Sequence, residues 1–186
     1  MYVVIYRGKF GFIKPWTAVR DGETFSQQFL TPSIIEGIEK KLFPETLDVA
    51  GIHKIIRHKL SYQTMDSQQE VTQTRGWKST KTCHIRPRSI IVRDILLNPI
   101  LYLAFDSIES ALRASEQHIC LCRNEDVLLP DEDIRELDEA SFSSLKGFEL
   151  RFGKSALSFL VGYNRFDNNQ PMYGWIEYNG QTLMGE

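Results

Sequence analysis

TPSIIEGIEKKLFP, residues 31–44 of the 186-residue chain, has the pattern of a short amphipathic helix. One face of that helix would carry the apolar side chains Ile34, Ile35, Ile38 and Leu42. Thr31 can cap the helix through its hydroxyl, and Pro32 suits the first turn because its missing N–H would be unbonded there anyway. Gly37 costs about 1 kcal/mol against alanine inside a helix, which indicates close packing at that position. We therefore expect a helix that covers a sheet.

Strand-like segments lie on both sides of this helix. YVVIYRGKF (2–10), GIHKIIRHKLSYQT (51–64) and SIIVRDILLNPILYLAF (89–105) are rich in β-branched and aromatic residues. SIESALRAS (107–115) is a second short helix with Ser107 as its cap, and QHICLCR (117–123) returns to a strand. The order is β-α-β, a long excursion, then β-α-β. It predicts an α+β, ferredoxin-like fold.

The composition favours a soluble cytoplasmic protein. Hydrophobic residues make up 42% of the chain, but no apolar run approaches the roughly 18–20 residues of a membrane span. The N-terminal apolar residues precede the charged ones, unlike the order in a signal peptide. The three cysteines, Cys83, Cys120 and Cys122, make an odd number, so a reducing compartment is favoured over a disulfide framework.

The net charge of −2 conceals a division between the two halves of the chain. Residues 1–93 hold 15 Lys/Arg and 8 Asp/Glu, a net charge of +7, and residues 94–186 hold 7 and 16, a net charge of −9. Such a division suggests a polyanion on the basic side and a protein partner on the acidic side. Ordinary soluble proteins also show asymmetry of this kind, which is the alternative explanation.

The excursion DSQQEVTQTRGWKSTKTCHIRPR (66–88) is the most distinctive polar segment. From Val71 to Arg93 it contains six Lys/Arg residues and no acidic residue. A β-ribbon of this composition buries too little apolar surface to be stable alone, so we expect an arm that is ordered by what it grips. Its cations would neutralise phosphates, and Trp77 would offer a face to an unpaired base. The alternative is a plain surface hairpin without a ligand.

Two other clusters favour ordinary structural roles. His118, Cys120 and Cys122 would lie on one face of a strand, but zinc pairs usually have turn-borne Cys-x-x-Cys spacing and no fourth ligand is obvious. Buried cysteines are also common core residues, so no metal site is predicted. The run 131–139 could form a carboxylate site, but a solvated, partner-facing surface is favoured. No phosphate-binding glycine loop and no Ser-His-Asp arrangement is visible, so no cofactor and no catalytic residue is predicted.

Several motifs resemble the Cas-five family, the subunit of type I CRISPR surveillance complexes (Cascade) that holds the five-prime handle of the guide RNA. TPSIIEGI (31–38) is similar to the family's Thr-Pro-Ser…Gly-Ile helix start, and RSIIVRD (88–94) to its Arg…Leu-Arg-Asp strand. CLCRNEDVL (120–128) looks like the family's Leu-Gly-Arg-x-Glu-Asp segment, with Cys122 in place of glycine. The order of these motifs carries most of the weight. The resemblance covers roughly residues 1–130.

The resemblance implies an RNA-recognition-motif-like core in residues 1–130 with a β-hairpin thumb at about 65–88. Residues 131–186 would then form an acidic connector and a small C-terminal β extension packed on the core. The thumb would kink the guide RNA in antiviral defence. The Cascade backbone subunit and large subunit would be protein partners, and this position is compatible with proximity to target DNA. The candidate RNA-binding residues are Arg20, Arg75, Trp77, Lys78, Lys81, His84, Arg86, Arg88 and Arg123.

One branch of the family is a metal-independent endoribonuclease that processes precursor guide RNA. Its proposed site uses a Tyr just after the helix, which aligns with or next to Phe43, and a Lys-His pair after the long third strand. Phenylalanine has no hydroxyl for acid–base work, and DSIESALRAS (106–115) supplies no Lys-His pair. A non-catalytic binder is therefore predicted. The alternative is a displaced nuclease site made of Tyr62, Lys81 and His84.

Overall fold

Strands dominate the computed structural model, which describes residues 1–15, 23–73, 76–164 and 168–183. These residues form sixteen strands and four helices. The helices are α1 (Pro32–Leu42), η1 (Pro44–Thr46, a 3₁₀ helix), α2 (Ile108–Ser115) and α3 (Glu139–Ser144). Within the described residues, no helix combines the length and the apolar character that a membrane span requires.

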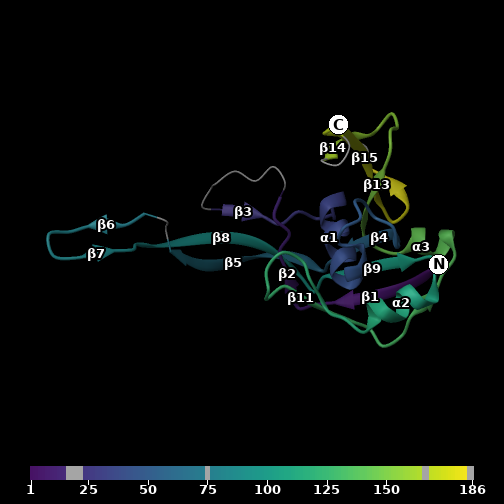
Figure 1. Ribbon diagram of the computed structural model, residues 1–186, viewed down its shortest axis with the longest axis horizontal. Helices are drawn as coiled ribbons and strands as arrows, with labels where there is room; N and C mark the ends of the chain where they lie inside the picture. The colour runs from purple at the N-terminus through teal and green to yellow at the C-terminus, as the bar shows by residue number, and fades with distance from the viewer. Residues whose placement is uncertain (16–22, 74–75, 165–167, 184–186) are drawn as a thin grey trace.

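Ten of the strands form one antiparallel main sheet (Figure 1). Its order is β10-β11-β1-β9-β4-β13-β15-β14, with β12 also paired to β1 and β16 to β15. In chain order, its strands are β1 (Tyr2–Arg7), β4 (Ile55–Ser61), β9 (Ile100–Phe105), β10 (Ile119–Cys120), β11 (Val127–Pro130), β12 (Arg135–Glu136), β13 (Phe148–Phe152), β14 (Phe159–Asn164), β15 (Gln170–Tyr178) and β16 (Gln181–Thr182).

The predicted ferredoxin-like α+β core is wrong, because the described residues are mostly β and the main sheet contains ten strands. The expected small C-terminal β extension is instead part of this sheet. β13 pairs with β4 at Phe148 and Leu60, and β15 then pairs with β13 over five residues. Without β13, β4 would be an edge strand with unpaired N–H and C=O groups. The C-terminal strands cover that edge and enlarge the sheet.

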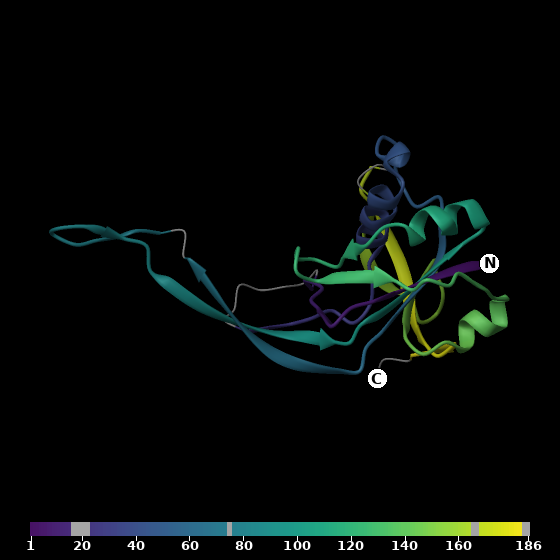
Figure 2. The ribbon, with the colours of Figure 1, turned by 90° about the horizontal axis from the view of Figure 1, so that it is seen from below.

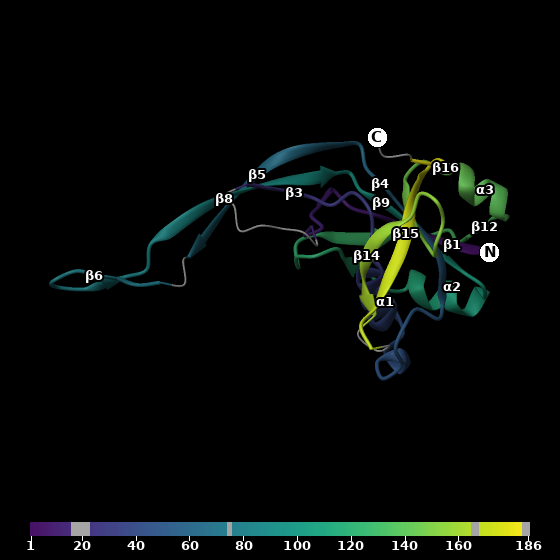
Figure 3. The same cartoon turned by 90° about the horizontal axis from the view of Figure 1, so that it is seen from above.

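The second sheet projects from the rest of the protein. β5 (Thr64–Gln73) and β8 (Arg88–Leu97) pair antiparallel over ten residues, from Thr64 opposite Leu97 to Gln73 opposite Arg88. β2 (Phe10–Gly11) pairs antiparallel with β8, and β3 (Glu23–Phe25) pairs with it in the parallel direction. Farther out, β6 (Lys78–Ser79) pairs with β7 (His84–Ile85). We call the described residues between 64 and 97 the arm, which extends outward in every ribbon view (Figures 1–3).

Both faces of the main sheet are covered near β1. Helices α1 and α2 pack on one face, where Leu42 and Ala111 belong to the same buried cluster as Val4. Helix α3 packs on the other face, where Phe142 belongs to a cluster with Ile5. Figure 2 shows α2 and α3 on opposite sides of the sheet. A strand buried on both faces needs a continuous apolar run, as in the sequence of β1.

Helix α1 is confirmed, but two details predicted for it are wrong. Thr31 precedes the first turn, yet its hydroxyl makes no capping hydrogen bond to the helix and lies 3.2 Å from the Ser33 hydroxyl. Gly37 is not closely packed, because a Cβ atom added there would meet no atom within 4 Å. In α2 the predicted cap is confirmed: the Ser107 hydroxyl accepts a hydrogen bond from the Ser110 N–H at 3.2 Å.

Phe43 ends α1 and points into the core. Its side chain is 1% exposed, and its ring meets that of Phe105 edge-on with 5.9 Å between the ring centroids. The Lys54 Nζ atom and the Arg113 guanidinium carbon lie 5.0 and 5.5 Å from the Phe43 centroid. Phe43 and Leu42 both belong to the main buried cluster, so the position aligned with the nuclease tyrosine serves packing.

Candidate functional site

The tip of the arm is the most exposed and the most basic part of the described chain. Every residue from Gly76 to Arg86 is exposed. Four candidate RNA-binding cations lie in or beside this stretch and are described: Lys78, Lys81, Arg86 and Arg88. The sequence holds no carboxylate between Val71 and Arg93 that could neutralise them locally. The tip therefore presents a concentrated positive charge far from the core.

Trp77 and Arg86 form a joint surface on the tip. The Trp77 side chain is 62% exposed, and the Arg86 guanidinium carbon lies 5.3 Å from its ring centroid. His84 is on the neighbouring strand, where its Nδ1 atom is 2.8 Å from the Ser79 hydroxyl. An exposed indole beside a guanidinium offers a flat face for stacking together with a cation for a phosphate.

The attached end of the arm is held to the rest of the protein by charged side chains. Arg93 on β8 forms an ion pair with Glu70 on β5, and its guanidinium carbon lies 5.0 Å from the Phe12 ring centroid. The Arg123 guanidinium carbon lies 5.7 Å from the centroid of the same ring, and its Nη1 atom donates a hydrogen bond of 2.9 Å to the side-chain Oε1 atom of Gln68. The Arg93–Phe12 and Arg123–Gln68 contacts tie the arm to the core, whereas the Arg93–Glu70 ion pair joins the two strands of the arm.

Arg123 differs from the other candidate RNA-binding residues. Its side chain is 14% exposed, and its guanidinium binds the fully buried Asp126 carboxylate, with Nη2 and Oδ1 2.7 Å apart. Its hydrogen bonds stabilise the 123–126 turn and connect that turn to Gln68 on β5. Arg123 is therefore not one of the exposed cations of the tip. Arg20 and Arg75 lie outside the described residues.

The structure does not assemble the displaced nuclease site considered above. Tyr62 lies at the attached end of the arm, where its ring stacks on Phe148 with 6.2 Å between centroids. Lys81 and His84 lie beyond the far end of the β5–β8 pair. Ten paired residues at about 3.3 Å each separate the two ends by roughly 30 Å. These three side chains are therefore too far apart to act on one phosphate.

The His118–Cys122 segment does not form one continuous strand face. β10 contains only Ile119 and Cys120, and Cys122 is exposed in the turn that follows. The Cys120 thiol lies 3.7 Å from the Asn124 carbonyl oxygen. Among the described residues, no three His, Cys, Asp or Glu side chains are grouped closely enough to hold a metal ion.

The acidic segment is divided between internal contacts and a free surface. Asp131 forms an ion pair with Arg7 at 2.9 Å, and Glu139 forms one with Arg57 at 2.6 Å. The Asp138 carboxylate caps α3 by accepting a hydrogen bond of 2.7 Å from the Ser141 N–H. No ion pair within the described residues engages the remaining exposed carboxylates, which are Glu132, Asp133 and Glu136.

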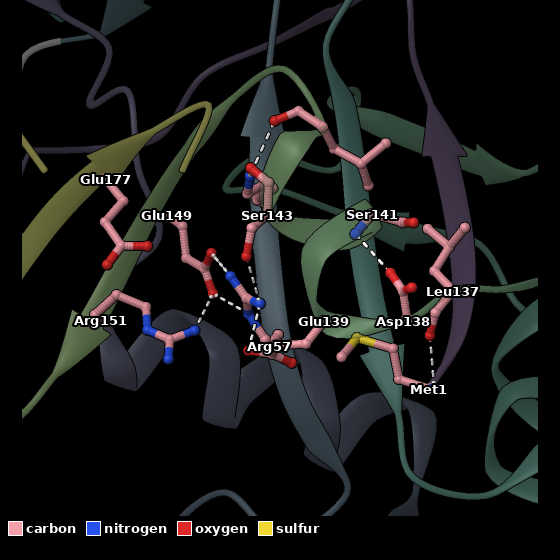
Figure 4. Close-up of polar contacts among 12 residues, drawn as sticks. Met1, Arg57, Leu137, Asp138, Glu139, Ser141, Ser143, Glu149, Arg151 and Glu177 are labelled. Atoms are coloured by element: carbon pink, nitrogen blue, oxygen red, sulfur yellow. Dashed lines mark hydrogen bonds and ion pairs between the residues drawn. The ribbon is translucent and has the colours of Figure 1, made fainter. Parts of the chain in front are cut away.

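A buried network of charges, which the sequence pattern did not predict, joins β4, α3 and β13 (Figure 4). Arg57 donates two hydrogen bonds to the buried Glu149 carboxylate, at 2.9 and 2.6 Å, and a third to Glu139. Burial raises the pKa of Glu149, but the hydrogen bonds and the charge of Arg57 outweigh it and hold that pKa below its usual value. Lys59 donates to the Ser143 and Leu145 carbonyl oxygens at the end of α3. The network fastens α3 to the sheet.

In comparisons with known proteins, no family model and no curated protein sequence matches this chain. The likeness to the Cas-five family therefore rests on the motifs quoted above.

Proposed function

We propose that this chain is an RNA-binding subunit that grips single-stranded RNA with the tip of the arm. The observation that carries the proposal is a projecting β-ribbon whose described tip is exposed and basic, with no carboxylate between Val71 and Arg93. Lys and Arg side chains release counterions from phosphates, which supplies affinity without sequence preference. Trp77 adds a stacking face, and this favours a strand with unpaired bases over a closed duplex.

We further propose that the RNA is the five-prime handle of a CRISPR guide and that the chain is a non-catalytic subunit of a type I Cascade complex. The order of the quoted motifs supports this assignment. The exposed carboxylates Glu132, Asp133 and Glu136 offer a surface to the backbone or the large subunit of such a complex. The odd number of cysteines supports the cytoplasm as its location.

Charge reversal at the tip tests the proposal. In the triple variant Lys78→Glu, Lys81→Glu, Arg88→Glu we expect weaker binding of a repeat-derived single-stranded RNA. Each lost phosphate contact should reduce the slope of log affinity against log salt by about 0.7, or by about 2 for three contacts. Fluorescence anisotropy at several salt concentrations measures both quantities.

The matched control is Lys41→Glu, Arg135→Glu, Lys146→Glu, which changes the net charge equally at exposed positions outside the arm. It should retain most of the affinity and the original salt slope. Equal losses in both triple variants would show that only the total charge matters. Unchanged binding in the arm variant would refute the role of the tip.

A further inference from the structure

A wide groove separates α1 from the last strands of the main sheet, and α1 lies beside β14 and β15 in Figure 3. Its volume is about 1290 Å³, more than the roughly 300–1,000 Å³ of an ordinary small-ligand pocket. Gly37 lies on the helical wall, where a Cβ atom would meet nothing within 4 Å. Phe152, Tyr163 and Tyr173 lie on the opposite wall. We call this the α1–β14 groove.

The sheet wall of the groove presents aromatic rings and a cation. Tyr163 is 58% exposed and Phe152 is 45% exposed, so both have faces available to a ligand. The Lys154 Nζ atom lies 5.1 Å from the Tyr173 ring centroid. Among the described residues, no carboxylate lies within ion-pair distance of Lys154.

The helical wall adds no free negative charge. Glu36 is the one carboxylate among the described residues that line the groove, and it accepts hydrogen bonds from the Lys40 Nζ atom at 2.7 Å and the Gly51 N–H at 3.2 Å. The first turn of α1, which lies at the groove, contains no acidic residue. With Lys40 and Lys154 against Glu36, the described lining has a net positive charge. Aromatic faces beside an excess of positive charge suit bases and phosphates together.

We propose that the α1–β14 groove binds a short run of unpaired nucleotides, with bases stacked on Tyr163 and Tyr173 and a phosphate near Lys154. This inference rests on the proposed RNA-binding function and adds a second contact to it. β3 pairs with the arm strand β8. Only six residues, 26–31, connect β3 to the start of α1, whose first turn lies at the groove. An RNA strand gripped by the arm could therefore continue toward the groove.

A groove-filling substitution provides the main test. Gly37→Leu places a side chain in open space on the helix and replaces the poorest helix former other than proline, so folding is preserved. We expect it to weaken binding of a tetrauridylate probe, and Tyr163→Ala to do the same. Loss of one stacked base corresponds to a decrease in affinity of roughly 5- to 150-fold. The matched control Gly37→Ala is too small to fill the groove and should bind as the unaltered protein does, and the conservative variant Tyr163→Phe keeps a stacking ring and should recover most of the affinity lost in Tyr163→Ala.

Binding affinity is measured for the unaltered full-length chain and for its four groove variants, each with and without the charge reversals in the arm. The ligands are tetrauridylate, uridine monophosphate and a long repeat RNA. A 4-thiouridine probe should crosslink to a peptide that contains Tyr163 or Tyr173. Equal affinity for the monophosphate and the tetranucleotide would overturn the RNA assignment in favour of a free-nucleotide site. If the long RNA binds through the arm while Gly37→Leu leaves tetrauridylate binding intact, the groove inference alone fails. If no RNA of any length binds, the proposed function fails.

Discussion

His58 on β4 is a buried imidazole with an unsatisfied nitrogen. Its side chain is 4% exposed, and its Nε2 atom has no hydrogen-bond partner among the described residues. Its ring stacks on Phe152 with 6.0 Å between centroids. Burial lowers the pKa of His58 to about 4; Glu149 opposes this shift, and Arg151 and Arg57 add to it. The folded protein therefore holds the neutral ring.

This burial predicts a stability that depends on pH. The unfolded chain keeps a His58 pKa near 6.5, so it binds more protons than the folded chain between about pH 6.5 and 4. The contribution of His58 to stability is thus fully present above pH 6.5 and is lost as the pH falls toward 4, by about 3 kcal/mol in all. His58→Phe keeps a stacking ring and removes the unpaired nitrogen. It should raise the free energy of unfolding at pH 7 by about 1–3 kcal/mol.

Urea denaturation of the His58→Phe variant across this pH range measures both effects. The variant should show a flatter dependence of unfolding free energy on pH than the unaltered chain. The exposed His84→Phe is the control and should leave that dependence unchanged. A variant at position 58 that keeps the full pH dependence would show that other groups cause it.

The neighbours of His58 show what the sequence can and cannot tell about single residues. The strand at 55–61 was predictable from its β-branched content, but its pattern does not show which of its charged side chains are buried. Arg57 and Lys59 are both buried, because each has a hydrogen-bond partner in a distant part of the sequence. Arg57 pairs with Glu149, 92 residues later, and Lys59 with the Ser143 carbonyl oxygen, 84 residues later. No local pattern contains partners at that separation. An isolated buried charge is costly, so the pairing partners decide whether such a strand can enter the core.

At the level of elements, local signals sufficed for α1 and α2 but not for α3 or for the pairing of the sheets. The apolar stripe and Pro32 placed α1 correctly, and Ser107 placed α2. The pairing of β13 with β4 joins residues 148 and 60 and has no local signature. The charge of the arm follows directly from its composition. Its length does not, since β8 continues to Leu97 while the expected hairpin ended near residue 88.

Trp77 is the residue through which the arm can be tested without disturbing the fold. Its exposed ring contacts Arg86 and lies outside both buried clusters, so Trp77→Ala should change the melting temperature little. Loss of one stacked base should cost about 1–3 kcal/mol of RNA-binding free energy. Trp77→Phe keeps a smaller ring and should recover part of that loss. Titration of labelled RNA at fixed salt measures the difference, and equal affinity in all three proteins would exclude stacking on Trp77.

At the scale of the whole molecule, positive and negative charge lie at opposite ends. The basic tip with β6 and β7 is at one end of the long axis, and α3 and β12 of the acidic segment are at the other (Figures 1 and 3). A polyanion drawn to the tip is therefore kept away from the acidic end by repulsion. Under the proposed function, that end would remain available to a protein neighbour while the arm holds RNA.

Neutralising the free carboxylates tests this division of surfaces. Glu132→Gln, Asp133→Asn, Glu136→Gln removes three charges that make no ion pair within the described residues. We expect reduced co-purification with Cascade subunits and nearly unchanged RNA affinity. Asp48→Asn, Asp106→Asn, Glu116→Gln is the control at other exposed acidic positions. If the first variant changes RNA affinity and leaves co-purification intact, the assignment of the two ends is reversed.

The last prediction concerns catalysis, which requires groups from across the molecule to meet. General acid–base groups contribute about 10²–10⁴-fold each, but only within hydrogen-bond reach of the reacting phosphate. Phe43 lies in the core, Tyr62 is at the attached end of the arm, and Lys81 and His84 are near its tip.

Phe43→Tyr would place a hydroxyl beside Phe105, away from any RNA on the arm. We therefore expect no cleavage of labelled repeat RNA under single-turnover conditions in EDTA, with either the unaltered chain or Phe43→Tyr. A discrete product that disappears in Lys81→Ala or His84→Ala would instead show that the arm carries a nuclease site.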